Sequence, residues 1–176
     1  SPETRTSAEA PSLMPLEFAA VVTFDGPSRE LVHTAIAGDV PLEPAQPWPI
    51  HRGVIGRCLH TATTQYVPNV HADPDYVVLS ERVTSELVVP IRFQDEVLGA
   101  LDLESASTDV FTPANVLAFE AFADQVAGAI HMASVNDRLA DTTARPDEVL
   151  ANRFLDRDIQ KAIDSLPEEF RMVVLL

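Results

Sequence analysis

The sequence contains one cysteine, one lysine and no long run of apolar residues. A lone Cys58 cannot form an internal disulfide, which excludes a small secreted fold held by disulfides and favours a reducing compartment. No segment approaches the roughly 18 uninterrupted apolar residues that a membrane span needs. The first residues also lack the basic and then apolar pattern of a signal peptide. We therefore expect a cytoplasmic protein with no membrane partner.

Positive charge is scarce in this chain. The formal net charge is −15, Lys161 is the only lysine, and the arginines are scattered along the sequence. Binding to a phosphate backbone depends on clustered lysine and arginine side chains. The composition therefore excludes direct binding of nucleic acid by this chain.

Apolar β-forming runs predict one antiparallel sheet of five or six strands. The predicted strands are Leu16–Asp25, Glu30–Asp39, Gln65–Val70, Glu86–Phe93 and Val97–Ser105. Residues 40–53 carry four prolines, so they are expected to cross the surface irregularly. A short helix is expected after Gly53, and a long loop over residues 71–84. Residues 1–15 are rich in Ser, Pro, Thr and Glu and are predicted to be a flexible tail.

The second half of the sequence has helical periodicity. Thr112 is a plausible N-cap, Pro113 suits the first helical position, and apolar residues follow every three or four positions. A helix over Pro113–Ala140 would be about 42 Å long, so its end should project or pair with another helix. A further amphipathic pattern, Leu155, Ile159, Ile163 and Leu166, predicts another helix.

The order of these motifs resembles a GAF domain. The matching stretches are GVIG, TQYVPNV, DPDY, SELVVPI, VLGALDLES and FTPANVLAFEAFADQVAGAIH, within residues 16–135. The resemblance implies an α+β fold with a central antiparallel sheet, helices on one face, and loops that roof a small-molecule pocket on the other. We assign residues 16–140 to this domain and residues 141–176 to a helical extension. The helix that usually precedes the first strand in the family is not evident.

The extension has a resemblance of its own. DRDIQKAIDSLPEEFRMVVLL, residues 156–176, is similar to the opening of region four of bacterial sigma factors. The family's helix-turn-helix would lie beyond Leu176, so promoter binding is not assigned, and the resemblance implies a partner in the transcription machinery. The apolar residues 173–176 are expected to be buried against the GAF helices or a partner subunit.

Strand alternation brings three acidic residues to the predicted pocket face. In VLGALDLES, Leu98, Ala100, Asp102 and Glu104 share one face, while Val97, Gly99, Leu101 and Leu103 share the other, beneath the helices. Glu86 is expected beside Asp102 and Glu104 on the adjacent strand. These acids either contact a ligand or have a structural role, with Glu86 bracing the loop and Arg92 or Arg82 as a partner.

Free methionine sulfoxide reductases, a catalytic GAF branch, hold a ligand ammonium group with acids at the matching positions. This resemblance implies a cationic or amino-bearing ligand at Glu86, Asp102 and Glu104. The other candidate ligand contacts are Tyr66, Tyr76, Asp73 and Ser85. Aromatic residues can equally be part of the core, and an Asx turn explains Asp73 equally well.

Catalysis is not expected. The loop HADPDYVVLSERVTSE has no cysteine where that reductase family keeps its pair, and Cys58 alone cannot re-form an internal disulfide. Cys58 is either a buried inert thiol or a sensor thiol. Cys58 and His60 face different ways on a short helix, so with His51 they predict no metal site. No cofactor is indicated.

Three functional hypotheses follow. The first is a noncatalytic sensory module in a transcription-related protein, in which a small ligand or partner biases the terminal helices. The second is a ligand-free assembly module that forms a homodimer through those helices. The third is a degenerate sulfoxide reductase that retains the three acids and Cys58.

Overall fold

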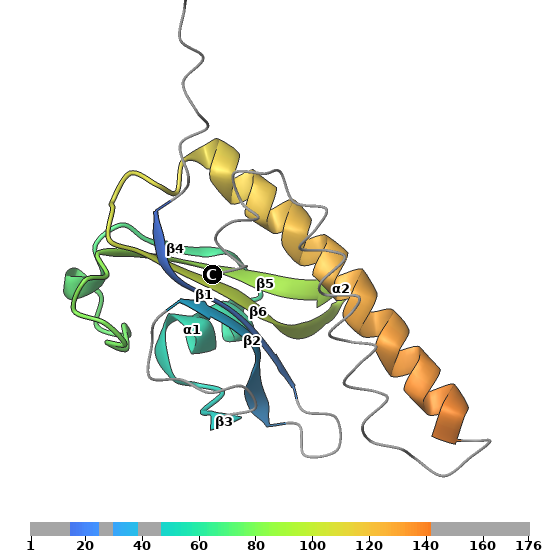
Figure 1. Ribbon diagram of the computed structural model, residues 1–176. Helices are drawn as coiled ribbons and strands as arrows, with labels where there is room; N and C mark the ends of the chain where they lie inside the picture. The colour runs from blue at the N-terminus through green and yellow to red at the C-terminus, as the bar shows by residue number, and fades with distance from the viewer. Residues whose placement is uncertain (1–14, 25–29, 39–46, 142–176) are drawn as a thin grey trace, which may run out of the picture.

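The computed structural model describes residues 15–24, 30–38 and 47–141, with side chains up to residue 135 (Figure 1). The elements are β1 Leu16–Phe24, β2 Leu31–Gly38, β3 Pro47–Trp48, α1 Gly53–Thr61, β4 Gln65–Val67, the 3-10 helix η1 Val70–Ala72, β5 Ser85–Phe93, β6 Glu96–Ser105 and α2 Pro113–Asp141. The strands form one six-stranded sheet in the order β3-β2-β1-β6-β5-β4, with antiparallel pairing throughout. The predicted α+β fold is confirmed.

Helix α2 covers one face of this sheet. Its buried side chains Phe119, Phe122 and Val126 pack against the alternate residues of β5 and β6. Leu87 and Leu103 are among those strand residues, and each is at most 1% exposed. Burial of such a side chain contributes roughly 1.5–3 kcal/mol. The helix begins as predicted, because the Thr112 hydroxyl accepts a hydrogen bond from the Asn115 amide at 3.3 Å.

The other face carries α1 and a loop. Val54, Ile55 and Cys58 of α1 lie in one apolar cluster with Val88 and Ala100 of the sheet. The loop of residues 73–84, here called the roof loop, adds its own apolar side chains to the same cluster: Tyr76, Val77, Leu79 and Val83. The structure thus refines the predicted layers, since α1 lies on the loop-covered face and α2 on the opposite one (Figure 1).

A bulge in β6 corrects one part of the predicted alternation. Arg92 pairs with Val97 and Ile91 pairs with Gly99, which leaves Leu98 as an extra residue between the two pairs. Leu98 therefore packs with the α2 core and does not share the face of Ala100 as predicted. From Gly99 onward the predicted alternation is correct.

Pro90 lies inside a central strand without breaking it. The pairing of β4 with β5 ends at Val88, opposite Gln65, so Pro90 lies beyond the partner that its missing N–H would have served. The predicted strand Gln65–Val70 is shorter in the structure. The chain leaves the sheet after Val67, where β4 ends, and η1 begins at Val70.

The predicted tail 1–15 lies outside the described residues except for its last residue, and the predicted extension 141–176 lies outside them except for Asp141. The sigma-like segment and residues 173–176 fall in this category. Among the described helices, none is both long and apolar enough to span a membrane. Helix α2 is 29 residues long, which corresponds to about 43 Å, and its last turns extend beyond the sheet in Figure 1.

Candidate functional site

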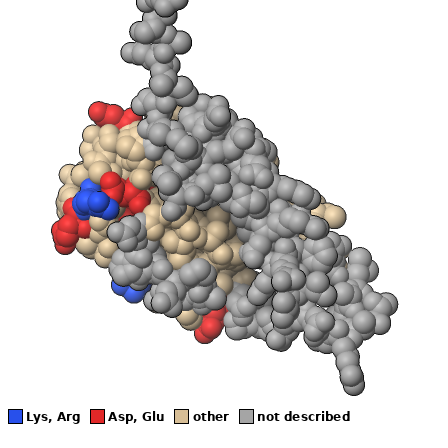
Figure 2. Space-filling view, in the orientation of Figure 1, with Lys and Arg blue, Asp and Glu red and all other residues tan. Residues whose placement is uncertain are grey.

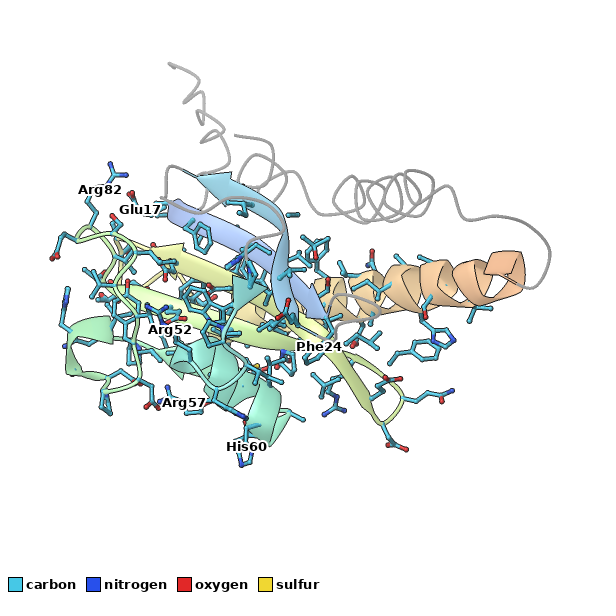
Figure 3. The ribbon with its side chains drawn as sticks, turned by 90° about the horizontal axis from the view of Figure 1, so that it is seen from below. Glu17, Phe24, Arg52, Arg57, His60 and Arg82 are labelled. Atoms are coloured by element: carbon cyan, nitrogen blue, oxygen red, sulfur yellow. The ribbon has the colours of Figure 1, made fainter. Side chains whose placement is uncertain are left out.

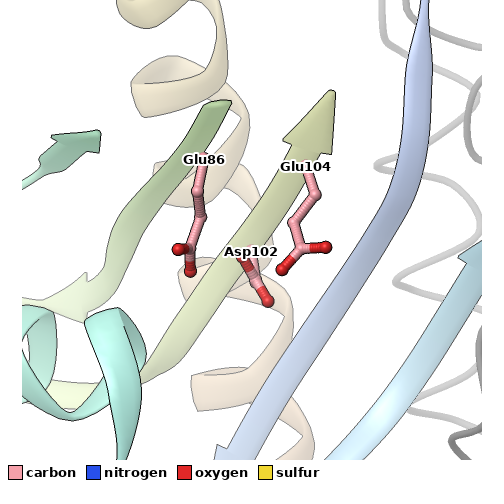
Figure 4. Close-up of side chains that lie close together, drawn as sticks. All are labelled: Glu86, Asp102 and Glu104. Carbon is pink, nitrogen blue, oxygen red and sulfur yellow. The ribbon is translucent and has the colours of Figure 1, made fainter. Parts of the chain in front are cut away.

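Three carboxyl groups converge on the face that the roof loop covers (Figure 4). Glu86 of β5 is directly opposite Glu104 of β6, and Asp102 lies two residues earlier on β6. One carboxyl oxygen from each lies within 4.8 Å of the others. We call these three residues the acid cluster. Since partner residues on antiparallel strands point to the same face, the sheet register alone brings them together.

The acid cluster is deeply buried. Glu86 is 4%, Asp102 is 2% and Glu104 is 1% exposed. Each keeps one buried carboxyl oxygen with no hydrogen-bond partner among the described residues. A buried polar atom left without a partner costs about 1–3 kcal/mol, and more if it is charged. The acid cluster therefore needs hydrogen-bond donors that the described residues do not supply.

Burial raises the pKa values of all three groups, and the charge of neighbouring carboxyl groups raises those of Glu86 and Glu104 further. Burial raises the pKa of Asp102 to about 7. Burial, followed by the charge of Asp102, raises the pKa of Glu104 to about 9. The pKa of Glu86 is raised well above its usual value by burial and then by Asp102 and Glu104. Two carboxylates about 5 Å apart repel by about 3 kcal/mol at an effective dielectric constant of about 20, so three full charges are not stable together.

Tyr76 of the roof loop faces the acid cluster. Its hydroxyl oxygen is buried and has no hydrogen-bond partner among the described residues. Its pKa is raised by burial and then by the charges of Glu104, Glu86 and Asp102. Its side chain packs against the apolar cluster on the same face of the sheet as these acids. Of the predicted ligand contacts outside the strands, Asp73 interacts electrostatically with Glu86, and Tyr76 interacts with all three acids.

Asp73 has a different partner. The Arg57 guanidinium of α1 donates to both carboxylate oxygens of Asp73, at 3.1 and 2.7 Å, and to Asp75 at 2.7 Å. The hydrogen bond from Arg57 is the main reason that the pKa of Asp73 is lowered. The Asp75 amide also donates to Asp73 Oδ1 at 2.9 Å, which is the predicted Asx turn. These contacts fix the start of the roof loop to α1.

Ser85 and Tyr66 are not near the acids. The Ser85 hydroxyl donates to the Ser107 carbonyl at 2.6 Å, and the Tyr66 hydroxyl donates to the Thr108 carbonyl at 3.0 Å. Tyr66 pairs with Leu87, a residue of the α2 core, so it belongs to the α2 face of the sheet. Both residues were predicted as ligand contacts, and in the structure both side chains bind the β6–α2 connection.

Neither arginine proposed as a partner for the acids has that role. Arg82 forms a 2.8 Å ion pair with Glu17, and both residues lie at the same edge of the molecule in Figure 3. Arg92 donates to the Ala62 carbonyl at 3.0 Å. Basic side chains are also few on the face drawn in Figure 2.

Cys58 is fully buried beneath β5. Its Sγ atom lies 3.7 Å from the Val88 carbonyl oxygen, to which the thiol donates. Burial, followed by the charges of Asp102 and Glu86, raises the pKa of the thiol to about 12. The thiolate needed for nucleophilic or metal chemistry is therefore suppressed. His60 on the same helix is exposed and projects away from the sheet (Figure 3).

His33 is a buried polar residue that the sequence interpretation missed. It pairs with Val22, so it lies on the same face of the sheet as the acid cluster. Its ring meets Trp48 edge-on, with centroids 5.4 Å apart. The sequence signal was its position two residues after the core residue Leu31, which places both on one face of β2.

The acid cluster is the set in the described chain whose oxygens are close enough to hold a metal ion. Hard divalent cations such as Ca²⁺ take about six to eight oxygen ligands, however, and this cluster offers three carboxyl groups in an apolar setting. The three unsatisfied oxygens match the three N–H donors of a primary ammonium group more closely.

Comparison with solved structures supports the fold. A type II free methionine-R-sulfoxide reductase from Thermoplasma acidophilum has a TM-score of 0.61 at 19% identity, over 68% of this chain and 82% of that one. A GAF domain from a phosphoenolpyruvate-protein phosphotransferase of Coxiella burnetii has a TM-score of 0.63 at 19% identity, over 70% and 76%. A putative GAF sensor protein from Burkholderia vietnamiensis is 30% identical with a TM-score of 0.53, over 63% and 68%.

Sequence comparison gives the family. Protein ZMO0507 of Zymomonas mobilis is 38% identical over 69 residues, which is 39% of this chain, and the matched part spans 43% of that relative's length. The family model for the GAF domain matches residues 4–130, a range that includes all six strands, the acid cluster and α2 up to Ile130. The chain belongs to the GAF domain family.

Proposed function

We propose that this chain is a noncatalytic GAF sensory module that binds a small, positively charged ligand at the acid cluster. The observation that carries the proposal is the unsatisfied oxygen on each of three buried carboxyl groups. A ligand cation supplies both the hydrogen-bond donors and the charge that the described residues do not.

The arrangement favours an amine. A primary ammonium group carries three N–H donors, and the cluster presents three carboxyl oxygens within 4.8 Å of one another. The Tyr76 hydroxyl is a further unsatisfied group at the same place and suits a polar atom next to the amine. Amino acids and other small primary amines are therefore the ligand class that we propose.

Two adjacent strands connect this site with α2. Leu87 follows Glu86 on β5, Leu103 separates Asp102 from Glu104 on β6, and both leucines pack in the α2 core. A ligand shifts the helix only if it binds one arrangement of these strands better than another. We propose that this coupling continues into residues 141–176, the part for which a transcription-related partner is proposed.

Sulfoxide reduction is disfavoured by the state of the only thiol. Cys58 is buried, its pKa is about 12, and the roof loop offers no second cysteine. Incubation with free methionine sulfoxide and a thiol reductant, followed by amino-acid analysis, is expected to show no methionine.

A thermal-shift screen tests the proposed function. Amino acids, amines and nucleotides are compared at millimolar concentration, with the wild type beside Asp102→Asn and Glu96→Gln, an exposed acid on the same strand. Ligand at about 100 times its Kd stabilises the folded state by about 2.7 kcal/mol. We expect a shift with amines that Glu96→Gln keeps and Asp102→Asn loses. Silence across all ligands contradicts the proposal.

A further inference from the structure

The acid cluster is surrounded by groups that do not neutralise it. Tyr76 and Asp73 of the roof loop and Cys58 of α1 each interact electrostatically with at least one of its carboxyl groups. His33 of β2 shares its face of the sheet, two strands from β6. Arg57, the nearby cation on α1, is already bound to Asp73 and Asp75. Among the described residues, no Lys or Arg side chain forms a recorded ion pair with Glu86, Asp102 or Glu104.

When no ligand is bound, protons are the remaining means of neutralising the negative charge of the acid cluster. The three carboxyl groups are buried, and one oxygen of each lies within 4.8 Å of the others. Three full negative charges at this spacing repel one another strongly. Burial and spacing together therefore favour at least one protonated carboxyl group when no cation is bound.

We propose that the acid cluster stores protons near neutral pH and exchanges them for the positive charge of the bound ligand, so that the module responds to ligand and pH together. This inference rests on the proposed function. One cation enters as one proton leaves, so the net charge of the buried site does not change. The proton passes to solvent or buffer, and no bond other than O–H is broken.

The direction of the pH effect follows from this exchange. The raised pKa values, about 7 for Asp102 and about 9 for Glu104, place the stored protons in the neutral to mildly alkaline range. If one proton leaves for each ligand bound, affinity rises up to about tenfold per pH unit until the proton is already lost in the empty site. Below neutral pH the ligand competes with a fully protonated cluster and binds weakly.

Infrared spectroscopy tests the stored protons without any ligand. A protonated carboxyl group has a carbonyl stretch distinct from that of a carboxylate, so the wild type in deuterated buffer near neutral pH should retain this band. Glu104→Gln and Glu86→Gln should each reduce it, and the exposed control Glu96→Gln should leave it unchanged. Complete ionisation of the carboxyl groups by about pH 6 would overturn the inference.

Proton release tests the exchange. Methylammonium chloride is added to weakly buffered protein near neutral pH, and an indicator dye reports protons released beyond those seen with sodium chloride. We expect release that saturates with methylammonium and that Asp102→Asn reduces. Saturable binding without release overturns the exchange while leaving the proposed function intact. An infrared band with no binding of any amine overturns the exchange and the proposed function, and the two failures are thus distinguishable.

Discussion

Arg57 and Asp73 form a bidentate ion pair that joins α1 to the roof loop, with hydrogen bonds of 3.1 and 2.7 Å. The fork of the guanidinium matches the two carboxylate oxygens, which gives this pair a defined geometry that lysine does not reproduce. The roof loop has no regular secondary structure after η1, so this contact fixes where the loop begins. Tyr76 lies three residues further along the same loop.

Arg57→Lys is expected to loosen the roof loop. Because the Arg57 side chain is 29% exposed, solvent weakens the pair, and we expect a loss of no more than about 1 kcal/mol in global stability. Hydrogen exchange in residues 73–84 should accelerate far more than exchange in β6. Arg82→Lys, which alters an exposed pair with Glu17, is the control and should leave the loop unchanged.

The acid cluster should make the protein less stable as pH rises, whereas carboxyl groups in ion pairs make a protein more stable as pH rises. The folded-state pKa values of the acid cluster lie above the unfolded ones, so its groups favour folding at low pH and lose that contribution as pH rises through the folded values. For Asp102, a rise from 3.8 to about 7 corresponds to a loss on the order of 4 kcal/mol.

Chemical denaturation from about pH 5 to pH 9 measures this effect. The free energy of unfolding of the wild type should fall across the range, and Asp102→Asn should flatten the profile and stabilise the protein at the alkaline end. Glu96→Gln should keep the wild-type slope. A wild-type profile that rises with pH over this interval would contradict the assigned protonation.

Cys58 should be unreactive in the folded protein. At pH 8 a thiol with a pKa of about 12 is almost entirely protonated, and the side chain is fully buried. Ellman's reagent should label it only after denaturant is added, at the rate of global unfolding. Rapid labelling in native buffer would show that Cys58 is an accessible thiol and would support the alternative that it is a sensor thiol.

Association through the terminal helices remains a prediction. On α2, Leu117 is 66% and Met132 is 56% exposed, although both are large apolar residues. If these side chains belong to a homodimer interface, sedimentation should give a dimer at tens of micromolar and a shift to monomer in Leu117→Asp. Exposed Asp124→Asn is the control on the same helix. A wild-type monomer over this range would reject the homodimer.

Local patterns predicted the sheet and the acid cluster because both depend on alternation along strands. Asp102 and Glu104 share a face whatever else the chain does, and Glu86 joins them once β5 and β6 pair. The partners of charged groups were not predictable in this way. Arg57 and Asp73 are 16 residues apart and meet only because α1 and the roof loop lie on one face of the sheet.

The prediction from alternation was wrong where the strand is irregular. Leu98 was assigned to the acid face by simple alternation, but the bulge at this residue turns it toward α2. His33 was missed for a different reason. Alternation from Leu31 places its ring on the buried face, but its contact with Trp48 arises from β3, a strand of only two residues that the sequence patterns did not predict.

The extra residue at Leu98 is absorbed locally, because the pairs on both sides of the bulge stay in step with β5. Deletion of Leu98 would leave Val97 opposite Arg92 and Gly99 opposite Ile91, so the ladder would become regular and Asp102 and Glu104 would keep their face. The bulge is therefore expected to set the local twist of the hairpin and to supply the Leu98 side chain to the α2 core, while the position of the acid cluster does not depend on it.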